Sequence, residues 1–582
     1  MPRRRVLLAQ LPIPPVGPEP LRGNVPLAAA YLTLVARRRG LEGAFTFDLL
    51  PPAIANEFGD AALVDAIDAR APDVLGFTCY LWNVVRTLHV ARALKARRKE
   101  LVVILGGPEI TADNDWVLAD AAIDFAVFGE GEQTFAEWLA WLAGGSDRAA
   151  LGRIAGLGHR DGARFVRHAP RTPMSDLAPI SSPYREGILD AGDAEQLLLE
   201  TVRGCIFRCK FCYYPKAYDS QFFLAAEHVR GDLAHARDRG VREVFLLDPT
   251  LNQRKDFAAF VELLVECNPD GRLEYHGELR GEGITPAPAQ RMRAANFVEV
   301  EVGLQSVAPR TQELMDRRNN LRAFETGVRA LRDAGIRAKT DLIVGLPGDT
   351  PDTVREGYRF LRDRGLCDIA QVFRLSILPG TAFRQEAAML GISFAPRPPY
   401  SVLATPTLSA EEIDELLAEA ESVFDCTFDP LPEAGHPAWF DASRSTLGVP
   451  TSWSVDLDET PGRLVPPAAI AFVFALRFVT GEPFAHGARM AGALRELLAH
   501  NPHSTLLVVL AVRAEFPFDV LEHLREAMTP APDVYQELHH VAHTGTGGAA
   551  RRLAVELPEA ARAQLDPEWC EELAALAEIV WR

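Results

Sequence analysis

The segment that says most about this 582-residue chain is Glu200-Thr-Val-Arg-Gly-Cys-Ile-Phe-Arg-Cys-Lys-Phe-Cys-Tyr-Tyr214. Its three cysteines, Cys205, Cys209 and Cys212, have the spacing C-x3-C-x2-C. Three thiolates so close together can hold three corners of a cubane iron–sulfur cluster, whereas a fully ligated cluster uses four cysteines. One iron then stays open to a small molecule, so such a cluster can perform chemistry as well as carry electrons.

A zinc site is the alternative for these cysteines. Structural zinc takes four Cys or His ligands. The sequence has no second C-x2-C pair, and His228 is the nearest candidate for a fourth ligand. The remaining cysteines are scattered, which argues against a disulfide framework and fits a reducing cytoplasm; they are Cys79, Cys267, Cys367, Cys426 and Cys570.

Composition limits the class of protein. With 48% hydrophobic and 24% charged residues, the chain can form sizeable cores, and its length predicts three or four domains. The net charge of −18 argues against nucleic acid as a main partner, because phosphate binding needs a basic surface. We also expect no membrane span, because the longest apolar stretch, Leu464–Val479, is interrupted by two prolines and an arginine.

Residues 1–145 alternate strand and helix patterns five times. Runs such as Leu101-Val-Val-Ile-Leu105 lack polar alternation, which is typical of strands covered on both faces. Repeated βα units predict a doubly wound parallel sheet, which binds ligands at the carboxyl ends of its strands. The predicted strands lie near residues 5–11, 43–50, 73–79, 101–105 and 123–128, and the helices between them include residues 27–39, 84–98 and 134–142.

A second set of βα units follows, with the cysteines directly after its first strand. Six units in about 200 residues are too few for the closed eight-unit barrel, which takes about 250 residues. An open six-unit barrel fits this length. The predicted strands lie near residues 197–202, 243–247, 273–278, 297–302, 338–344 and 370–375.

The division that we predict is residues 1–145 for the first domain, 146–195 for a linker, 196–400 for the partial barrel and 401–582 for a C-terminal α+β domain. An acidic helix over residues 409–424 is expected after the barrel. The C-terminal domain carries no motif that we recognise. His539, His540 and His543 have a spacing like that of metal ligands, but Gly-Thr-Gly-Gly follows, and solvated loop histidines are the more common explanation.

The cysteine triplet at a strand exit resembles the radical S-adenosylmethionine (SAM) superfamily. Glycine-rich exits of three neighbouring strands in the first domain resemble the cobalamin-binding domain that precedes many such enzymes, and Asn24-Val-Pro-Leu27 is similar to a stretch common near its start. Residues 1 to about 400 therefore resemble the cobalamin-dependent class B radical SAM methyltransferases. The resemblance implies a flavodoxin-like domain followed by a partial (β/α)6 barrel.

The resemblance also implies which residues bind the cofactors. The chain has no D-x-H-x-x-G motif, which implies cobalamin bound without a histidine ligand on its lower face. Cobalamin would contact the exits of strands three, four and five, at Thr78, Tyr80, Leu81, Trp82, Gly106, Gly107, Pro108, Glu109, Gly129, Glu130 and Gly131. SAM would contact the open iron and the residues Phe211, Tyr213, Glu278, Arg280, Gln305 and Ser306.

In this family Glu278 would hold the amino group of SAM and Arg280 its carboxylate, although the two could instead form an ordinary surface ion pair. The function implied is methylation of an unactivated carbon of a small molecule or peptide, through methylcobalamin and a 5′-deoxyadenosyl radical. An electron donor such as flavodoxin or ferredoxin would serve the cluster. The alternatives are a non-methylating cobalamin radical SAM enzyme, which would cyclise or rearrange its substrate, and a cobalamin-binding sensor with a vestigial cluster.

Overall fold

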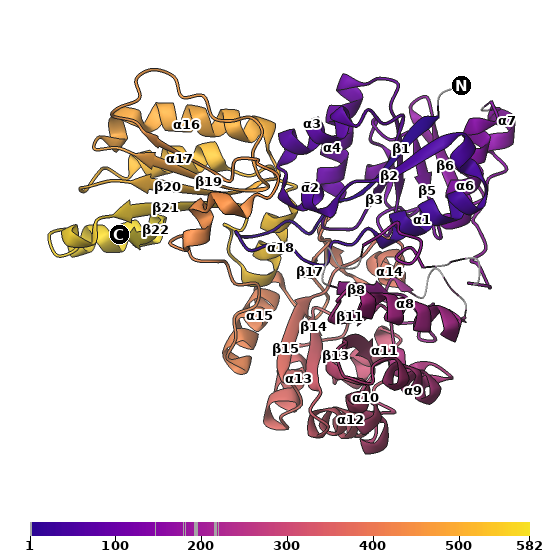
Figure 1. Ribbon diagram of the computed structural model, residues 1–582. Coiled ribbons are helices and arrows are strands. Elements are labelled where there is room, and N and C mark those ends of the chain that lie inside the picture. The colour runs from indigo at the N-terminus through magenta and orange to yellow at the C-terminus, as the bar shows by residue number, and fades with distance from the viewer. Residues whose placement is uncertain are drawn as a thin grey trace.

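The protein is built on three mainly parallel β-sheets, each covered by helices (Figure 1). The computed structural model describes residues 3–145, 147–177, 180, 182–190, 196–214, 218 and 220–582. The first domain and the C-terminal domain lie side by side, and the barrel lies beneath them in the view of Figure 1. This arrangement confirms the predicted α/β class.

The first sheet has the strand order β2-β1-β3-β4-β5-β6-β7, and its first five strands are parallel, as predicted. β6 and β7 join it antiparallel, although they come from the range that we assigned to the linker. The strands are β1 (Arg4–Gln10), β2 (Phe45–Leu49), β3 (Val74–Thr78), β4 (Val102–Gly106), β5 (Phe125–Val127), β6 (Leu157–Asp161) and β7 (Arg164–Arg167).

Helices cover both faces of this sheet. Val6 and Leu8 of β1 pack on one face with α1 and α6, while Leu7 packs on the other with α3 and α4. This alternation explains why the strands read as continuous apolar runs. The helices are α1 (Leu27–Arg38), α2 (Pro52–Glu57), α3 (Asp60–Ala69), α4 (Val84–Arg97), α5 (Asp115–Leu118), α6 (Glu132–Ala143) and α7 (Arg148–Leu151).

The second sheet is the open barrel, with all six predicted strands parallel and β8 and β15 at its two edges. Its strands are β8 (Gln196–Leu199), β11 (Glu243–Leu246), β12 (Glu274–Leu279), β13 (Phe297–Gln305), β14 (Arg337–Val344) and β15 (Ile369–Arg374). The helices around it are α8 (Ala226–Asp238), α9 (Phe257–Cys267), α10 (Pro286–Ala295), α11 (Pro309–Leu314), α12 (Leu321–Asp333), α13 (Pro351–Asp363) and α14 (Ala382–Leu390).

Two short antiparallel pairs flank the barrel. β9 (Val202–Arg203) pairs with β10 (Phe222–Phe223), and β16 (Ser393–Phe394) pairs with β17 (Val402–Ala404). The acidic helix that we expected is α15 (Ala410–Phe424). It begins in a capping box, in which Ser409 and Glu412 each accept a hydrogen bond from the other's backbone N–H.

The C-terminal sheet differs from our α+β prediction, because all its strands are parallel and helices connect each strand from β19 onward to the next. The sequence indicates strands near residues 505–512 and 554–557, and two strands do not reveal a parallel order. The strands are β18 (Ser452–Asp456), β19 (Val473–Val479), β20 (Thr505–Ala511), β21 (Arg551–Leu557) and β22 (Glu578–Trp581), and the helices are α16 (Pro483–His500), α17 (Asp519–Met528), α18 (Tyr535–Thr544) and α19 (Pro567–Leu576).

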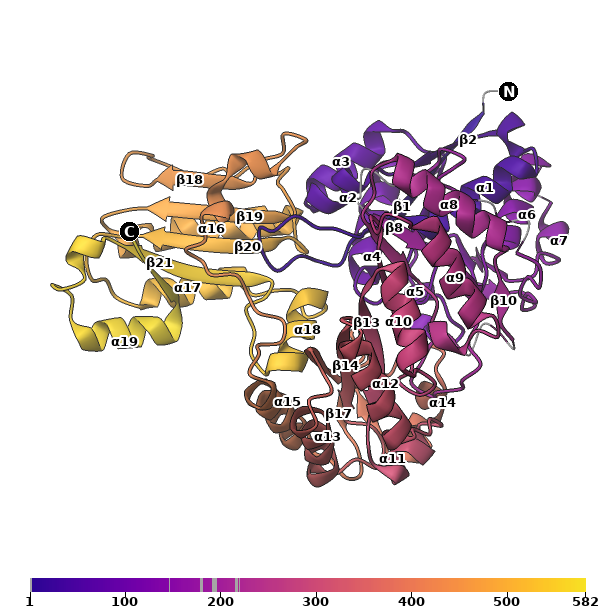
Figure 2. The ribbon, with the colours of Figure 1, turned by 60° about the horizontal axis from the view of Figure 1, so that its bottom comes forward.

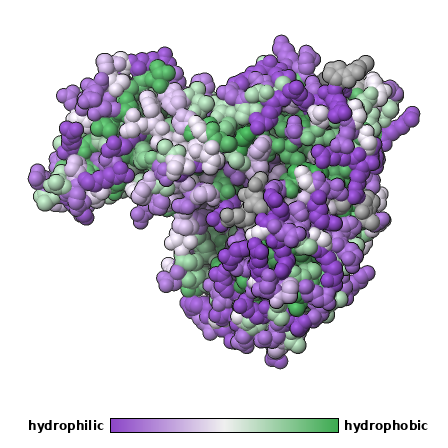
Figure 3. Space-filling model, viewed as in Figure 1, coloured by the Kyte–Doolittle hydropathy of each residue, from purple (hydrophilic) through white to green (hydrophobic). Residues whose placement is uncertain are grey.

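A buried contact fixes the C-terminal domain against the first domain. Arg86 donates to Asp60 at 2.8 Å, and its guanidinium lies 3.6 Å from the centre of the Phe472 ring. Hydrophobic residues gather near this junction, while hydrophilic residues cover most of the barrel surface in the same view (Figure 3). No helix in the described part of the chain is both long and apolar enough to cross a membrane.

Candidate active site

The cysteine loop begins at the carboxyl end of β8, just beyond the β9–β10 pair. Cys205 and Cys209 are buried, and Cys212 is half-buried. Gly204 has a φ of 93°, and a Cβ at this position would lie 2.2 Å from the backbone oxygen of Ser220. The turn into Cys205 therefore requires glycine.

The spacing of the three sulfurs disfavours a single zinc ion. Zn–S bonds of about 2.3 Å place the sulfurs of a tetrahedral site about 3.8 Å apart. Among the described residues, the only group with three ligand atoms within 4.8 Å of one another lies elsewhere, in the C-terminal half of the chain. Burial raises the pKa of the Cys212 thiol to about 11, so a thiolate there depends on the positive charge of a bound metal centre.

Two polar side chains that we did not predict approach the cysteine sulfurs. Thr250 Oγ1 lies 3.7 Å from Cys205 Sγ, and Arg317 Nη1 lies 4.0 Å from Cys209 Sγ. Hydrogen bonds to the sulfurs are among the factors that set the reduction potential of an iron–sulfur cluster. Thr250 lies in Asp248-Pro-Thr-Leu-Asn252, which follows a predicted barrel strand and could have indicated it, whereas Arg317 belongs to no motif near the cysteines.

The predicted SAM-binding pair separates in the structure. Glu278 is exposed at the open mouth of the barrel, where the surrounding protein and the Glu301 carboxylate raise its pKa to about 7. Arg280 is buried and pairs with Glu282 at 3.1 Å, and it also donates to the backbone oxygen of Arg318. Glu278 and Arg280 therefore do not form the surface ion pair that was the alternative explanation. The contact of Arg280 with SAM stays a prediction.

Gln305 has the local geometry expected of a ligand contact. Its φ is 70°, and its buried Oε1 has no hydrogen-bond partner among the described residues. An orphaned buried acceptor costs about 1–3 kcal/mol, which a bound ligand can offset. Ser306 is already engaged with Asp349 and the Ala308 backbone. Phe211 packs against the barrel core.

A cavity of about 360 Å³ lies at the exits of β3, β4 and β5. Most of the predicted cobalamin residues line it, namely Thr78, Tyr80, Gly106, Gly107, Pro108, Gly129, Glu130 and Gly131. The other side of the cavity is formed by residues that flank the cysteines, namely Glu200, Tyr213, Tyr214 and Tyr218. We expected Tyr213 beside SAM, and the structure places it in this shared wall, where burial raises its pKa to about 12.

Small residues keep this cavity open. Ala28 and Ala29 of α1 face Gly76 of β3 across it. Gly107 has a φ of 102°, and a Cβ there would lie 2.6 Å from the backbone oxygen of Cys79. Glycine is therefore required at position 107 because its backbone packs closely on that of Cys79.

The three other predicted cobalamin residues do not line the cavity. Leu81 and Trp82 lie in the turn behind it, where the Trp82 ring stacks on Tyr80 with centroids 4.5 Å apart. Glu109 is buried and accepts hydrogen bonds from Asn114 and from the Tyr400 hydroxyl. Glu109 therefore joins the first domain to the end of the barrel region, and its role toward cobalamin stays a prediction.

Arg203 connects the cavity to the cysteine loop. Its guanidinium donates to Glu130 at 3.0 Å, to Glu132 at 2.6 Å and to Glu200 at 3.0 Å. The side chains of Arg203, Glu130 and Glu132 are all buried. The sequence could not reveal this network, because Glu130 and Glu132 lie more than seventy positions before Arg203 and only Glu200 is close to it in the chain.

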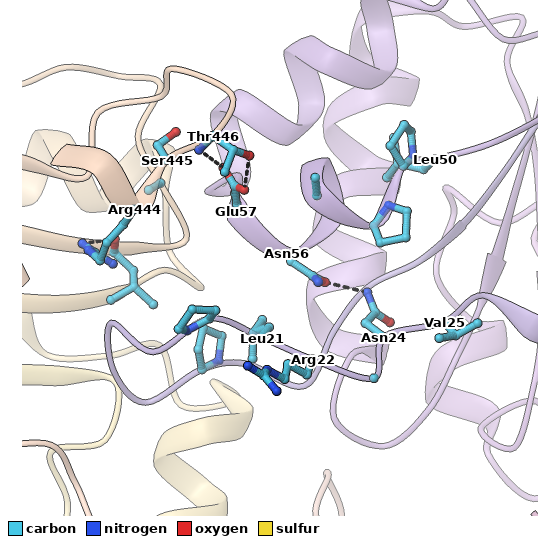
Figure 4. A pocket seen from close by; sticks show the side chains of 18 of the residues that line it. Leu21, Arg22, Asn24, Val25, Leu50, Asn56, Glu57, Arg444, Ser445 and Thr446 are labelled. Carbon is cyan, nitrogen blue, oxygen red and sulfur yellow. Dashed lines mark hydrogen bonds between the residues drawn. The ribbon is translucent and has the colours of Figure 1, made fainter. Parts of the chain in front are cut away.

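A larger cavity, of about 1110 Å³, lies between the first domain and the C-terminal domain (Figure 4). Asn24 donates to Asn56 at 2.8 Å on one side, and Thr446 donates to Glu57 at 2.6 Å on the other. Both sides belong to loops or helix ends, so sequence patterns did not indicate a cavity here.

The three histidines with metal-ligand spacing, His539, His540 and His543, lie on α18 and not in a loop, which corrects our expectation. The helix ends at Gly545, which has a φ of 72°, so the following Gly-rich segment is a helix stop. His540 is buried, while His539 and His543 are half-buried.

Comparison with protein families identifies both parts of this arrangement. Residues 24–139 match the B12 binding domain, and residues 199–361 match the radical SAM superfamily. A 2-(S-pantetheinyl)-carbapenam-3-carboxylate methyltransferase from Streptantibioticus cattleyicolor is 26% identical over 379 residues, which cover 61% of this chain and 55% of that protein. The cobalamin-dependent radical SAM methyltransferase TokK from Streptomyces tokunonensis is 25% identical over 56% of this chain and 51% of its own length. The chain thus spans about half the length of these relatives.

Other similar proteins differ in their named reaction. An anaerobic magnesium-protoporphyrin IX monomethyl ester cyclase from Rubrivivax gelatinosus is 25% identical, over 60% of this chain and 64% of the cyclase. The structure of the radical SAM methyltransferase TsrM from Kitasatospora setae, with tryptophan and a SAM analogue, shares the fold with a TM-score of 0.54 and 19% identity, over 66% of this chain and 76% of TsrM. The chain therefore joins a segment that matches the B12 binding domain to a segment that matches the radical SAM superfamily.

Proposed function

We propose that this protein is a methyltransferase that uses a [4Fe–4S] cluster, SAM and cobalamin to methylate an unactivated carbon of a small molecule or peptide. The observation that carries the proposal is the shared wall: residues on both sides of the cysteine triplet close the cavity at the exits of the first sheet. A radical made at the barrel mouth would therefore arise beside the corrin. The names of the methyltransferase relatives support the same reading.

Each group of residues has a distinct part in this proposal. Cys205, Cys209 and Cys212 hold three corners of the cluster, and Glu278 holds the amino group of SAM. When bound, the cluster supplies the electron that splits SAM, and methylcobalamin supplies the methyl group. Tyr213 and Tyr214 cover the cavity and exclude water from it.

We further propose that cobalamin binds without a histidine on its lower face. Among the described residues that line the cavity there is no histidine. His89, the histidine nearest in sequence to the β3 exit, lies on α4, where its ring centre is 5.2 Å from that of His503 in the C-terminal domain. Of the turn from Thr78 to Trp82, Thr78 and Tyr80 would then lie beneath the corrin, because these two line the cavity.

The proposed electron donor and the proposed cytoplasmic location both follow from the chemistry of a reducible, oxygen-sensitive cluster. A flavodoxin- or ferredoxin-type protein would reduce the cluster, and the oxygen-sensitive cluster would require a reducing cytoplasm. The electron must enter from outside the chain, because the reaction consumes one for each SAM that is split.

The test is anaerobic reconstitution with iron, sulfide and cobalamin, followed by reduction with methyl-labelled SAM and pools of candidate substrates. We expect 5′-deoxyadenosine and a labelled product, and neither from Cys212→Ala. Deoxyadenosine together with a changed but unlabelled product would favour cyclisation, which is the reaction named for the cyclase relative. An intact cluster that never releases deoxyadenosine would favour the sensor.

A further inference from the structure

The inference concerns a cluster of metal-binding side chains between α15 and α18, outside the site described above. His539 and His543 lie one turn apart on α18, so their side chains share one face of the helix. Their ring centres are 4.3 Å apart, with an interplanar angle of 26°. Asp429, from the loop that follows α15, completes the group, and one ligand atom from each residue lies within 4.8 Å of the others.

The hydrogen bonding of His543 prepares it to bind a metal. Its Nδ1 lies 2.9 Å from the backbone oxygen of His539, which can only accept, so Nδ1–H is the donor. The lone pair is then on Nε2. This is the usual arrangement of a metal-binding histidine, whose second nitrogen donates to a carbonyl or carboxylate.

The separation of Asp429 from His539 also suits an ion between them. Asp429 Oδ2 lies 3.9 Å from His539 Nδ1, which is too long for a hydrogen bond. Two ligands bound at about 2.1 Å in a tetrahedral site are about 3.4 Å apart, so only a small adjustment would place both on one ion. Asp429 has a φ of 50°, a left-handed backbone conformation that aspartate adopts more readily than most residues.

The cluster lies where the C-terminal domain rests on the last barrel strand, and α15 and α18 are adjacent in both ribbon views (Figure 2). Arg374 of β15 donates to the backbone oxygen of Ala542 in α18 at 3.0 Å and to Asp414 in α15 at 2.6 Å. These contacts hold the two helices in place without any ion. The ligands are therefore positioned in advance, while their side chains stay partly open to solvent, 48% for Asp429 and 32% for His539.

We propose that Asp429, His539 and His543 bind one divalent transition-metal ion of the zinc type, with a further coordination position open to water. Two imidazoles and one carboxylate suit Zn²⁺ or Fe²⁺, whereas Mg²⁺ and Ca²⁺ prefer oxygen ligands alone. The ion joins the loop after α15 to α18. It thereby gives residues 401–582 a metal centre separate from the iron–sulfur cluster.

The test is a titration of the full-length, cluster-reconstituted protein with Co²⁺ alone, after passage over a chelating resin. Cluster assembly occupies the three cysteines, which could otherwise bind Co²⁺. The variant is His539→Gln with His543→Gln, and the matched control is His500→Gln, which changes an exposed histidine at the end of α16. We expect one equivalent of Co²⁺ with visible d–d bands, unchanged in the control. The variant should bind at least about 100-fold more weakly, because even outer-shell changes cost 10–100-fold.

A second readout keeps the proposal testable if the double variant folds poorly. Asp429→Asn changes an exposed loop residue and should weaken Zn²⁺ binding at least about tenfold while leaving the fold intact. Zn²⁺ should raise the melting temperature of the unaltered protein, and it should raise that of the Asp429→Asn variant by a smaller amount. The proposal is overturned if the double histidine variant binds Co²⁺ as tightly as the unaltered protein does. It is also overturned if the unaltered protein and the double variant both bind Co²⁺ only at millimolar concentrations.

Discussion

Replacing Arg203 by methionine tests the physical link between the two cofactor domains. Methionine keeps much of the side-chain volume but removes the cation that contacts Glu130, Glu132 and Glu200. The side chains of Arg203 and Glu130 are each only 5% exposed, so water cannot replace the lost interactions. Breaking a buried ion pair in this way costs about 3–5 kcal/mol.

This free energy converts into a measurable change in melting temperature. For a unit of 150–250 residues, 1 kcal/mol corresponds to about 2–4 °C, so we expect a loss of about 6–20 °C in the transition of the barrel domain, residues 196–400, which contains Arg203. The control is Arg230→Met, which breaks a solvent-exposed pair with Glu266 and should leave the melting temperature nearly unchanged. Cobalamin retention after gel filtration should fall in the Arg203 variant alone.

The pH dependence gives the sharper test. Burial raises the pKa of Glu200, and Arg203 opposes that rise. Without Arg203 the folded state binds protons more tightly than the unfolded chain, so the variant should regain stability as the pH falls from 8 toward the ordinary glutamate pKa of about 4.3. Thermal unfolding followed by circular dichroism across this pH range measures this. An equal, pH-independent loss in the Arg203 and Arg230 variants would refute the buried network.

Three further changes test the cofactor sites. Cys212→Ala should abolish the 400 nm absorbance of the reconstituted cluster, while Cys267→Ala should leave it unchanged, and equal loss in both would contradict the assignment. Because the pKa of Glu278 is about 7, its ionised fraction rises about tenfold between pH 6 and pH 8. SAM binding measured by calorimetry should strengthen accordingly, and Glu278→Gln should remove that dependence; an unchanged pH profile in the variant would rule Glu278 out. Gly107→Ala should destabilise the protein by about 1–3 kcal/mol, because it forces a strained backbone at a φ of 102°. Gly106→Ala has room for the methyl group and should weaken only cobalamin binding, as equilibrium dialysis would show; similar destabilisation by both would contradict the strain argument.

Local patterns were sufficient to predict most of the strands and the cysteine loop. β1 is buried from Val6 to Ala9 and β4 from Val103 to Leu105, so these stretches are apolar and can be recognised without information from distant residues. The C-terminal sheet was harder, because β19 lies in an apolar run that we examined as a possible membrane span. Its parallel order depends on pairings with β18 and β20, which sequence periodicity does not encode.

In the candidate site, too, local sequence predicted some residues, while others depend on contacts with distant parts of the chain. The glycines at strand exits were predictable, because a ligand that approaches the backbone requires them at fixed positions. Arg203 and Arg317 were not, because their roles depend on carboxylates and sulfurs that come from other strands. Glu109 was assigned to cobalamin on its position after Gly-Gly-Pro, but its contact with Tyr400 depends on how the end of the barrel region folds back.

The Arg203 network joins the two proposed cofactor sites and would allow them to cooperate. Arg203 is separated from Cys205 by a single glycine, and its carboxylate partners Glu130 and Glu132 follow β5 of the other domain. A displacement of the β5 exit would therefore move the start of the cysteine loop with it. In the proposed reaction the substrate would have to lose a hydrogen to the radical formed from SAM and receive a methyl group from cobalamin, so the two sites must keep a fixed relative position, which a flexible linker cannot provide. A buried, charged contact next to the cysteine loop would provide it.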